Sequence, residues 1–232
     1  MARHQATGIG QVGMRLIRGQ ACSTAPLPLL RASLPFGAMP AVVRRWRWRN
    51  LPRVWQGFWR LGLAYIVMRL TGIPIAYGAL SLVKICADGT RLDYGVVSVQ
   101  KVTSAFVAYV CTRLVDGNTS IGAFDFHGFG SGSNAESNAD TALQTEFTTE
   151  YATNNTRPTG TPSNPSANIY QSVATFSPDA NLTINEHGVF TQAATGGGTL
   201  LDRSSAASFN PVPMTNGDSV VATYRFTFAA EA

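Results

Sequence analysis

The chain has 232 residues, enough for one large domain or for a domain with a long extension. Hydrophobic residues make up 45%, which is sufficient for a core, but charged residues make up only 13%, against a usual share of roughly 25%. Low charge, 22 glycines and frequent Thr, Ser and Asn are poorly compatible with a helical bundle and indicate a β-rich protein with many turns.

Charge divides the chain into two parts. Residues 1–70 contain eleven Arg and no Lys, Asp or Glu, whereas seven basic residues oppose thirteen acidic ones from residue 71 onward. The net charge of +5 therefore describes neither part, and it does not predict nucleic-acid binding by the C-terminal part. We divide the chain into a basic N-terminal extension, residues 1–71, and a domain, residues 72–232. The three cysteines have no metal-ligand spacing and are interpreted as free thiols in a reducing compartment.

The extension contains all four tryptophans. Six consecutive residues interleave cations and aromatic rings: Arg44, Arg45, Trp46, Arg47, Trp48 and Arg49. One interpretation is a basic arm that contacts nucleic acid or a membrane surface, and a second is a targeting peptide. A third is that residues 1–67 are read-through from a misassigned start in G+C-rich DNA, so that the natural protein begins at or near Met68. We favour the third interpretation; a natural extension of this composition could also be disordered.

A transmembrane helix over Leu61–Val83 has sufficient length, at about 20 residues. However, Arg69 lies near its centre, which costs roughly 2.5–3.5 kcal/mol on insertion, and Gly72 and Pro74 follow directly. The sequence therefore predicts no span here.

The domain begins with a predicted hairpin. Ala79–Ile85 is β-like, Asp88-Gly89 supplies a turn, and the returning strand places Leu92, Tyr94 and Val96 on one face. Val102–Val115 changes to a helical period and predicts an amphipathic helix capped by Thr103 or Ser104. The helix places four apolar residues on one face: Val102, Phe106, Tyr109 and Val110. Asp116-Gly117-Asn118 is expected to end it.

The remaining residues predict mostly strands and turns. Ile121–Phe129 is a predicted strand, and Ser133 to Glu136 has the form of a capping box before a short helix with Leu143 and Phe147 on one face. Residues 148–166 predict a long surface loop. Further strands are predicted over 166–176, 182–190, 199–201 and 220–228, with turns at 196–198 and 216–218.

These elements predict a mainly β, two-layer β-sandwich of seven or eight strands with one or two short helices. In the last strand, one face is expected to enter the core: Val220, Ala222, Tyr224, Phe226 and Phe228.

The sequence contains no convincing catalytic or metal-binding set. His127 and His187 are too few for a metal site, and each is expected to hydrogen-bond a turn where its strand ends. Glu186 and His187 are adjacent in a predicted strand and therefore point to opposite faces. The glycines of Gly128–Gly132 have the wrong spacing for a phosphate loop and indicate a sharp turn or close packing. We predict no cofactor and no enzymatic activity; a carbohydrate-active enzyme would need a carboxylate pair that nothing in the sequence indicates.

Asp202 and Arg203 follow two leucines. We predict that they contact another subunit, because the planar guanidinium group suits interfaces; an internal ion pair is the alternative.

An ordered set of motifs resembles tailed-bacteriophage virion structural proteins. The set runs from about Ala79 to Phe228 and comprises Phe126–Gly132, Asp140–Glu146, Ile184–Phe190, Gly198–Ser204 and Gly217–Phe228. The resemblance implies assembly into a particle and carries no catalytic residues. The first 67 residues lie outside it.

The resemblance implies a capsid decoration or cement protein that binds the major capsid protein or other virion proteins and stabilises the head. A symmetric homo-oligomer without a small-molecule substrate is expected, localised in the virion after assembly in the bacterial host cytoplasm. A tail-fibre or baseplate component that binds the host is the first alternative. A structural protein that binds nucleic acid through the Arg/Trp arm is the second.

Overall fold

A computed structural model describes residues 40–71, 75–115, 123–151 and 154–229. Two helices and ten strands follow one another in these residues: α1 (Ala41–Thr71), β1 (Ile75–Ile85), β2 (Arg91–Lys101), α2 (Ser104–Val115), β3 (Phe126–Gly130), β4 (Thr161–Ser166), β5 (Ile169–Phe176), β6 (Leu182–Ile184), β7 (Glu186–Phe190), β8 (Leu200–Ser205), β9 (Val212–Met214) and β10 (Ser219–Ala229). The predicted β-rich fold class is confirmed, with more strands than the seven or eight expected.

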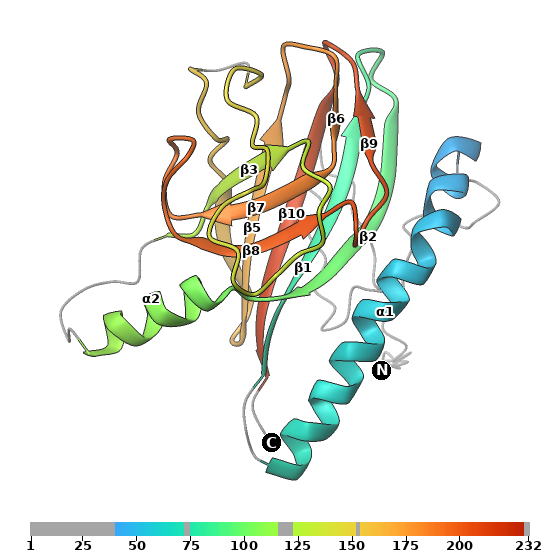
Figure 1. The fold of residues 1–232 in the computed structure, drawn as a ribbon. Helices are drawn as coiled ribbons and strands as arrows, with labels where there is room; N and C mark the ends of the chain where they lie inside the picture. Colours follow the sequence, from blue (N-terminus) through green and yellow to red (C-terminus); the bar gives the residue numbers. More distant parts are fainter. Residues whose placement is uncertain (1–39, 72–74, 116–122, 152–153, 230–232) are drawn as a thin grey trace, which may run out of the picture.

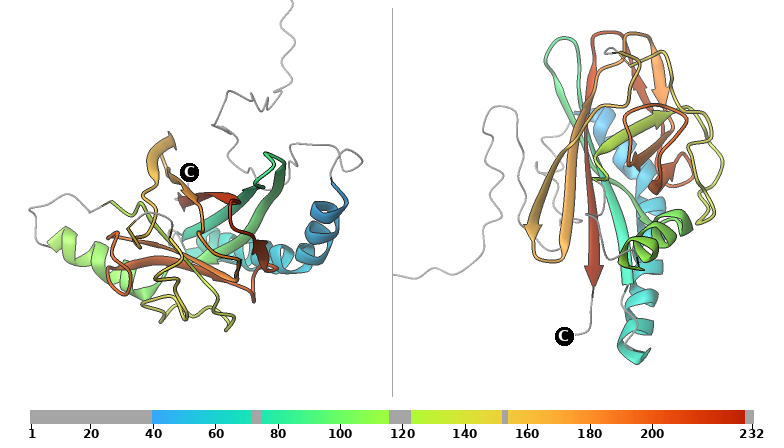
Figure 2. Two further views of the ribbon diagram at one scale, coloured as in Figure 1. Left: turned by 90° about the horizontal axis from the view of Figure 1, so that it is seen from above. Right: turned by 90° about the vertical axis from the view of Figure 1, so that its left-hand side faces the viewer.

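The strands form two packed layers. A five-stranded antiparallel sheet has the order β2-β1-β10-β5-β4, and a three-stranded sheet of order β3-β7-β8 lies across it. The strands of the small sheet cross those of the large sheet (Figure 1), which is the orthogonal form of sheet packing. The layers are seen from the side in the right-hand view of Figure 2. Strands β6 and β9 form a separate pair.

Strands β1 and β2 form the predicted hairpin around Asp88-Gly89. Gly89 has φ = +81°, and the Thr90 amide donates a hydrogen bond to the Asp88 carboxylate at 2.8 Å. The predicted face of β2 is wrong at one position, because its register against β1 shifts twice, beside Gly95, which has φ = +68°, and at Val97. These shifts make Val97, rather than Val96, the buried residue that follows Tyr94.

Strand β10 is central in the large sheet, with β1 on one side and β5 on the other. Its residues from Val220 to Phe226 alternate into the core, and Phe226 is 3% exposed. Phe228 was expected to continue this face, but it is 51% exposed. The small sheet does not extend as far as this end of the strand, which projects below it in Figure 1.

Helix α2 follows the sequence prediction closely. The Thr103 hydroxyl accepts a hydrogen bond from the Phe106 amide at 3.1 Å and so caps the first turn. The predicted apolar face packs on the second core cluster, where Phe106 contacts Phe124 and Phe226 edge-on. The predicted end of the helix at 116–118 lies outside the described residues.

The short helix predicted after Ser133 is wrong. Residues 131–148 instead run irregularly over the outer face of the small sheet, with Leu143 packed on Phe190 and Leu200. Glu136 does not complete a capping box, because its carboxylate accepts hydrogen bonds from the amide of Ser205 at 2.6 Å and from the hydroxyl of Ser208. Long-range partners therefore replace the local cap.

Two other stretches differ from their predictions. Residues 148–166 are not simply a surface loop, because they contain the buried Tyr151 and Arg157 and end in the exposed strand β4. Residues 182–190 form two strands rather than one. The chain passes from β6 to β7 at Asn185, whose amide donates to the Gly130 carbonyl at 2.9 Å.

Helix α1 packs along β2 and covers that edge of the large sheet (Figure 1). The buried Asn50 side chain donates to the Val97 carbonyl at 3.0 Å and accepts from the Asn210 amide at 2.9 Å. A Cβ atom at Gly57 would lie 3.0 Å from the Val99 carbonyl oxygen, so the helix approaches the strand closely. Residues 41–71 thus pack as a helix on the domain; residues 1–39 lie outside the described part. The start near Met68 stays a prediction, which intact-mass analysis of the natural protein tests.

Candidate functional site

The Arg/Trp segment at residues 44–49 lies in the first turns of α1, which separates its members. Trp46 faces the body, where its ring lies 4.7 Å from the Tyr94 ring and its indole N–H donates to the Pro211 carbonyl at 3.2 Å. Arg47 binds Asp93 through the backbone carbonyl at 2.7 Å and the carboxylate at 3.3 Å. The exposed members are Arg44, Arg45, Trp48 and Arg49. The segment therefore does not present one continuous cation-aromatic surface.

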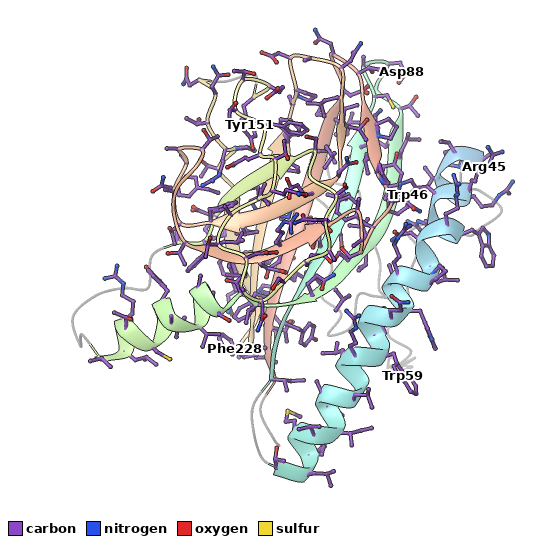
Figure 3. The ribbon with its side chains drawn as sticks, viewed as in Figure 1. Arg45, Trp46, Trp59, Asp88, Tyr151 and Phe228 are labelled. Atoms are coloured by element: carbon purple, nitrogen blue, oxygen red, sulfur yellow. The ribbon has the colours of Figure 1, made fainter. Side chains whose placement is uncertain are left out.

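A different set of α1 residues forms the most apolar exposed face of the helix. We call it the outer stripe: Leu51, Trp55, Trp59, Leu63, Ile66 and Leu70. Spacings of three or four residues place them on one side of the helix, and each is 50–80% exposed. Trp46 lies between α1 and the sheet, whereas Trp59 belongs to the outward side (Figure 3). The spacing was visible in the sequence, but the interpretation of residues 1–67 as an appended arm or artefact obscured it.

A second exposed apolar surface lies at α2. Val107, Leu114 and Val115 are exposed on this helix, which projects from the body on the side away from α1. The exposed Phe228 ring packs edge-on against Phe226, which in turn contacts Phe106 of α2. We call the exposed apolar residues of α2, Val107, Leu114 and Val115, the α2 surface.

The two domain histidines meet in the interior. His127 Nδ1 lies 2.9 Å from His187 Nε2, and His127 Nε2 lies 2.9 Å from the Ser172 hydroxyl oxygen. The expectation that each imidazole binds a turn is wrong. Neither the pairing of the histidines nor the role of Ser172 has a local signal in the sequence.

A hydrogen-bonded Ser–His pair is the geometry of an activated nucleophile, but this one is enclosed. His127 and Ser172 have no exposed surface, and His187 is 2% exposed. A Cβ atom at Gly160 would lie 2.1 Å from the Ser172 hydroxyl and 3.0 Å from His127 Nε2, so the backbone closes over the pair. The arrangement is a buried polar link between the two sheets.

Burial controls the protonation of this interior. It lowers the pKa of His127 to about 3 and that of His187 well below its usual value, to which the neighbouring imidazole contributes. Both histidines are therefore neutral in the folded protein at pH 7. Burial also raises the pKa of Asp202 well above its usual range; its carboxyl group lies with the Tyr224 hydroxyl beside Gly78.

These shifts predict that acid weakens the fold. Below about pH 6.5 the unfolded chain binds protons that the folded histidines exclude, so each imidazole removes up to about 1.4 kcal/mol of stability per pH unit. Asp202 has the opposite effect on stability. Above about pH 3.9 its folded carboxyl group keeps a proton that the unfolded chain releases, so this group makes the fold more stable as the pH falls. Two imidazoles outweigh one carboxyl group, so the free energy of unfolding should fall from pH 6 to pH 4.5.

Urea unfolding at several pH values measures this effect. Asp202→Asn removes the opposing group and should make the decline with acid steeper. Equal stability of the wild-type protein at pH 7 and pH 5 would contradict the buried neutral pair.

Arg203 and Asp202 do not form the predicted surface contact, because each is only 3% exposed. Arg203 donates to the Glu186 carboxylate at 2.8 and 2.9 Å and to Asp140 at 3.0 Å. The internal ion pair considered as an alternative is present, but its partners are Glu186 and Asp140 rather than Asp202. The interface prediction for these two residues is corrected accordingly.

The position of the Glu186 carboxylate also explains why glycines are required in the segment Gly128–Gly132. The carboxylate accepts hydrogen bonds from the amides of Gly132 at 3.1 Å, Gln144 at 2.9 Å and Thr145 at 2.7 Å. A Cβ atom at Gly130 or Gly132 would lie 2.6 or 2.5 Å from this carboxylate. The glycines therefore allow close packing, and an internal carboxylate occupies the position that an external anion would need.

The hydrogen bonds of Glu186 also connect the sequence motifs to one another. Glu186 joins segments from four of them: Phe126–Gly132, Asp140–Glu146, Ile184–Phe190 and Gly198–Ser204. We call these contacts the Glu186 anchor. The motif residues thus hold residues 131–147 on the small sheet.

Within the described ranges, no three His, Cys, Asp or Glu side chains gather in a group suited to a metal ion. None of the helices in this part of the chain combines the length and apolar character required to cross a membrane. No protein-family model matches the sequence, and no curated protein or solved structure is significantly similar to it.

Proposed function

We propose that this protein is a structural subunit of a tailed-phage virion and acts by binding rather than by catalysis. One observation carries the proposal: the histidine, serine and glutamate groups that meet in the domain are internal, whereas large apolar side chains are exposed on both helices. His127, Ser172 and Glu186 have no exposed surface. Exposed apolar side chains at helix surfaces are typical of sites that bind another protein.

The ordered motifs support a virion subunit in particular. They resemble those of virion proteins, and the Glu186 anchor joins four of them in this fold. Motifs with a structural task are compatible with a protein that works as a building block. We favour a capsid decoration protein, which would stabilise the head by burying surface between capsid subunits.

The edges of the large sheet favour contacts through surfaces rather than through added strands. Helix α1 lies along β2, and the other edge strand, β4, contains Pro162 and Pro165, which cannot donate ladder hydrogen bonds. We propose the α2 surface, with Leu114 73% and Val115 85% exposed, as the contact with the neighbouring virion protein.

Counting copies in purified particles tests this function. A decoration protein should follow the capsid lattice, in roughly tens to hundreds of copies, because closed shells repeat each contact around their symmetry axes. Its removal should leave assembled heads that resist heat less well. About twelve copies or fewer, together with a loss of adsorption, would instead support the tail component.

The α2 surface has a test of its own. Leu114→Asp should leave the fold intact, because the side chain is 73% exposed, and should prevent incorporation into particles. Thr175→Asp places the same charge at an exposed position of β5 and serves as the matched control. Normal incorporation of a folded Leu114→Asp protein would contradict a role for this surface.

A further inference from the structure

The outer stripe of α1 has no part in attaching the helix to the domain. Attachment uses the opposite side of the helix, where Trp46, Asn50 and Gly57 meet β2 and the residues after β8. Helical geometry places Leu51, Trp55 and Trp59 about half a turn away from these contacts. From Leu51 to Leu70 the stripe extends roughly 29 Å at about 1.5 Å per residue.

All charged side chains of α1 are positive. Helix α1 contains seven arginines and no acidic residue. Two of them, Arg47 and Arg53, are partly buried and contact the body at Asp93 and Asn210. The other five are exposed: Arg44, Arg45, Arg49, Arg60 and Arg69. Residues 72–232 are acidic overall, so the outward side of α1 forms a separate cationic and apolar surface.

We propose that this surface binds an anionic lipid bilayer, with α1 lying in the plane of the headgroups. A helix that combines Trp and Leu on one side with flanking Arg is the typical composition of interfacial helices. Indole rings favour the headgroup level, the aliphatic side chains enter the acyl boundary, and the arginines contact lipid phosphates. The domain would then sit above the membrane, held by the docked side of α1.

The composition of the stripe favours lipid over nucleic acid. Leu51, Leu63, Ile66 and Leu70 have no aromatic face on which a base could stack, and they gain nothing from phosphate contacts. They gain free energy when lipid removes them from water, by about 25 cal/mol for each Å² of apolar surface buried.

The charges also favour lipid over a second copy of α1. In a symmetric helix pair, the arginine-bearing flanks would meet without any acidic partner on α1. An anionic bilayer supplies the opposite charge along the whole helix. This inference does not depend on the virion assignment, but it rests on α1 (Ala41–Thr71) being part of the natural protein and therefore excludes a start near Met68.

Vesicle binding by the full-length chain tests the proposal. Vesicles of phosphatidylcholine alone are compared with vesicles that contain phosphatidylglycerol, using sedimentation and tryptophan emission. We expect binding only to the anionic vesicles, a blue shift of the emission, and quenching by brominated acyl chains. Added salt should weaken binding, because the arginine contribution is screened.

Variants separate the stripe from other surfaces. The triple variant Trp55→Gln, Trp59→Gln, Leu63→Gln should weaken vesicle binding at least tenfold, with its fold checked by circular dichroism. Val107→Gln combined with Leu114→Gln removes exposed apolar side chains from α2 and should leave vesicle binding unchanged. This control also distinguishes the inference from the proposed function, because only the α2 variants should impair particle incorporation.

Three results would overturn the proposal. The first is no binding of the wild-type chain to anionic vesicles. The second is equal binding by the triple variant. The third is concentration-dependent self-association that the triple variant abolishes while vesicles have no effect, which would identify a second copy as the occupant.

Discussion

Replacing Glu186 by alanine is expected to lower the free energy of unfolding by about 3–5 kcal/mol. The carboxylate is fully buried and binds Arg203 together with three backbone amides of residues 132–145. Alanine would leave the buried guanidinium group with Asp140 and Asn134 as its remaining side-chain partners. It would also leave three backbone amide donors of residues 132–145 without their acceptor.

Urea denaturation followed by circular dichroism measures this loss. Glu186→Gln keeps the size and one acceptor oxygen, so its loss should be smaller than that of the alanine variant. Asp179→Ala removes an exposed carboxylate and should change stability by less than about 0.5 kcal/mol. If Glu186→Ala lowered the free energy of unfolding no more than Asp179→Ala does, the Glu186 anchor would not hold residues 131–147 on the small sheet.

Hydrogen exchange adds a local test of the same variant. Amides of Gln144 and Thr145 donate directly to the carboxylate, so they should lose protection in Glu186→Gln. Amides in the β1–β10 ladder lie in the other sheet and should retain theirs under conditions where the variant remains folded.

Phe226→Ala should cost about 3–5 kcal/mol, as is typical for truncation of a buried aromatic side chain. Phe226 is 3% exposed on the central strand, and its ring packs edge-on against Phe106, with 5.2 Å between centroids. Alanine would leave a cavity where α2 meets the large sheet. Loss of this contact should also loosen α2, because Phe106 is its buried anchor.

Phe228→Ala is the matched control, since the same side chain on the same strand is half exposed two residues later. We expect its truncation to cost less than about 1 kcal/mol, because far less apolar surface returns to water. Equal losses for the two variants in urea unfolding would show that the end of β10 is covered differently.

The features that depend on neighbouring residues were predictable from the sequence. The Asp88-Gly89 turn, the Thr103 cap and the apolar face of α2 each involve groups within a few positions along the chain. Such contacts form largely independently of the rest of the fold, so residue type and spacing predict them. The alternating burial of side chains along β10 was also predictable from residue type, as far as Phe226.

Contacts between distant segments could not be predicted in the same way. The partners of His127 and Glu136 lie about 60 and 70 residues further along the chain. The capping-box prediction failed because a buried serine pair competes successfully with the local amide for the Glu136 carboxylate. Arg203 has no sequence signal for its partners, since either a partner subunit or an internal carboxylate satisfies a guanidinium group equally well.

The register shifts in β2 show the same limit on a smaller scale. Alternation predicts a face only while the register holds, and the shifts in β2 transfer the burial from Val96 to Val97. For α1, the sequence by itself determined a basic, tryptophan-rich segment without acidic residues. Only the tertiary structure decided which side of this helix packs on β2 and which stays exposed, because apolar residues occur on both sides and only one side meets the sheet.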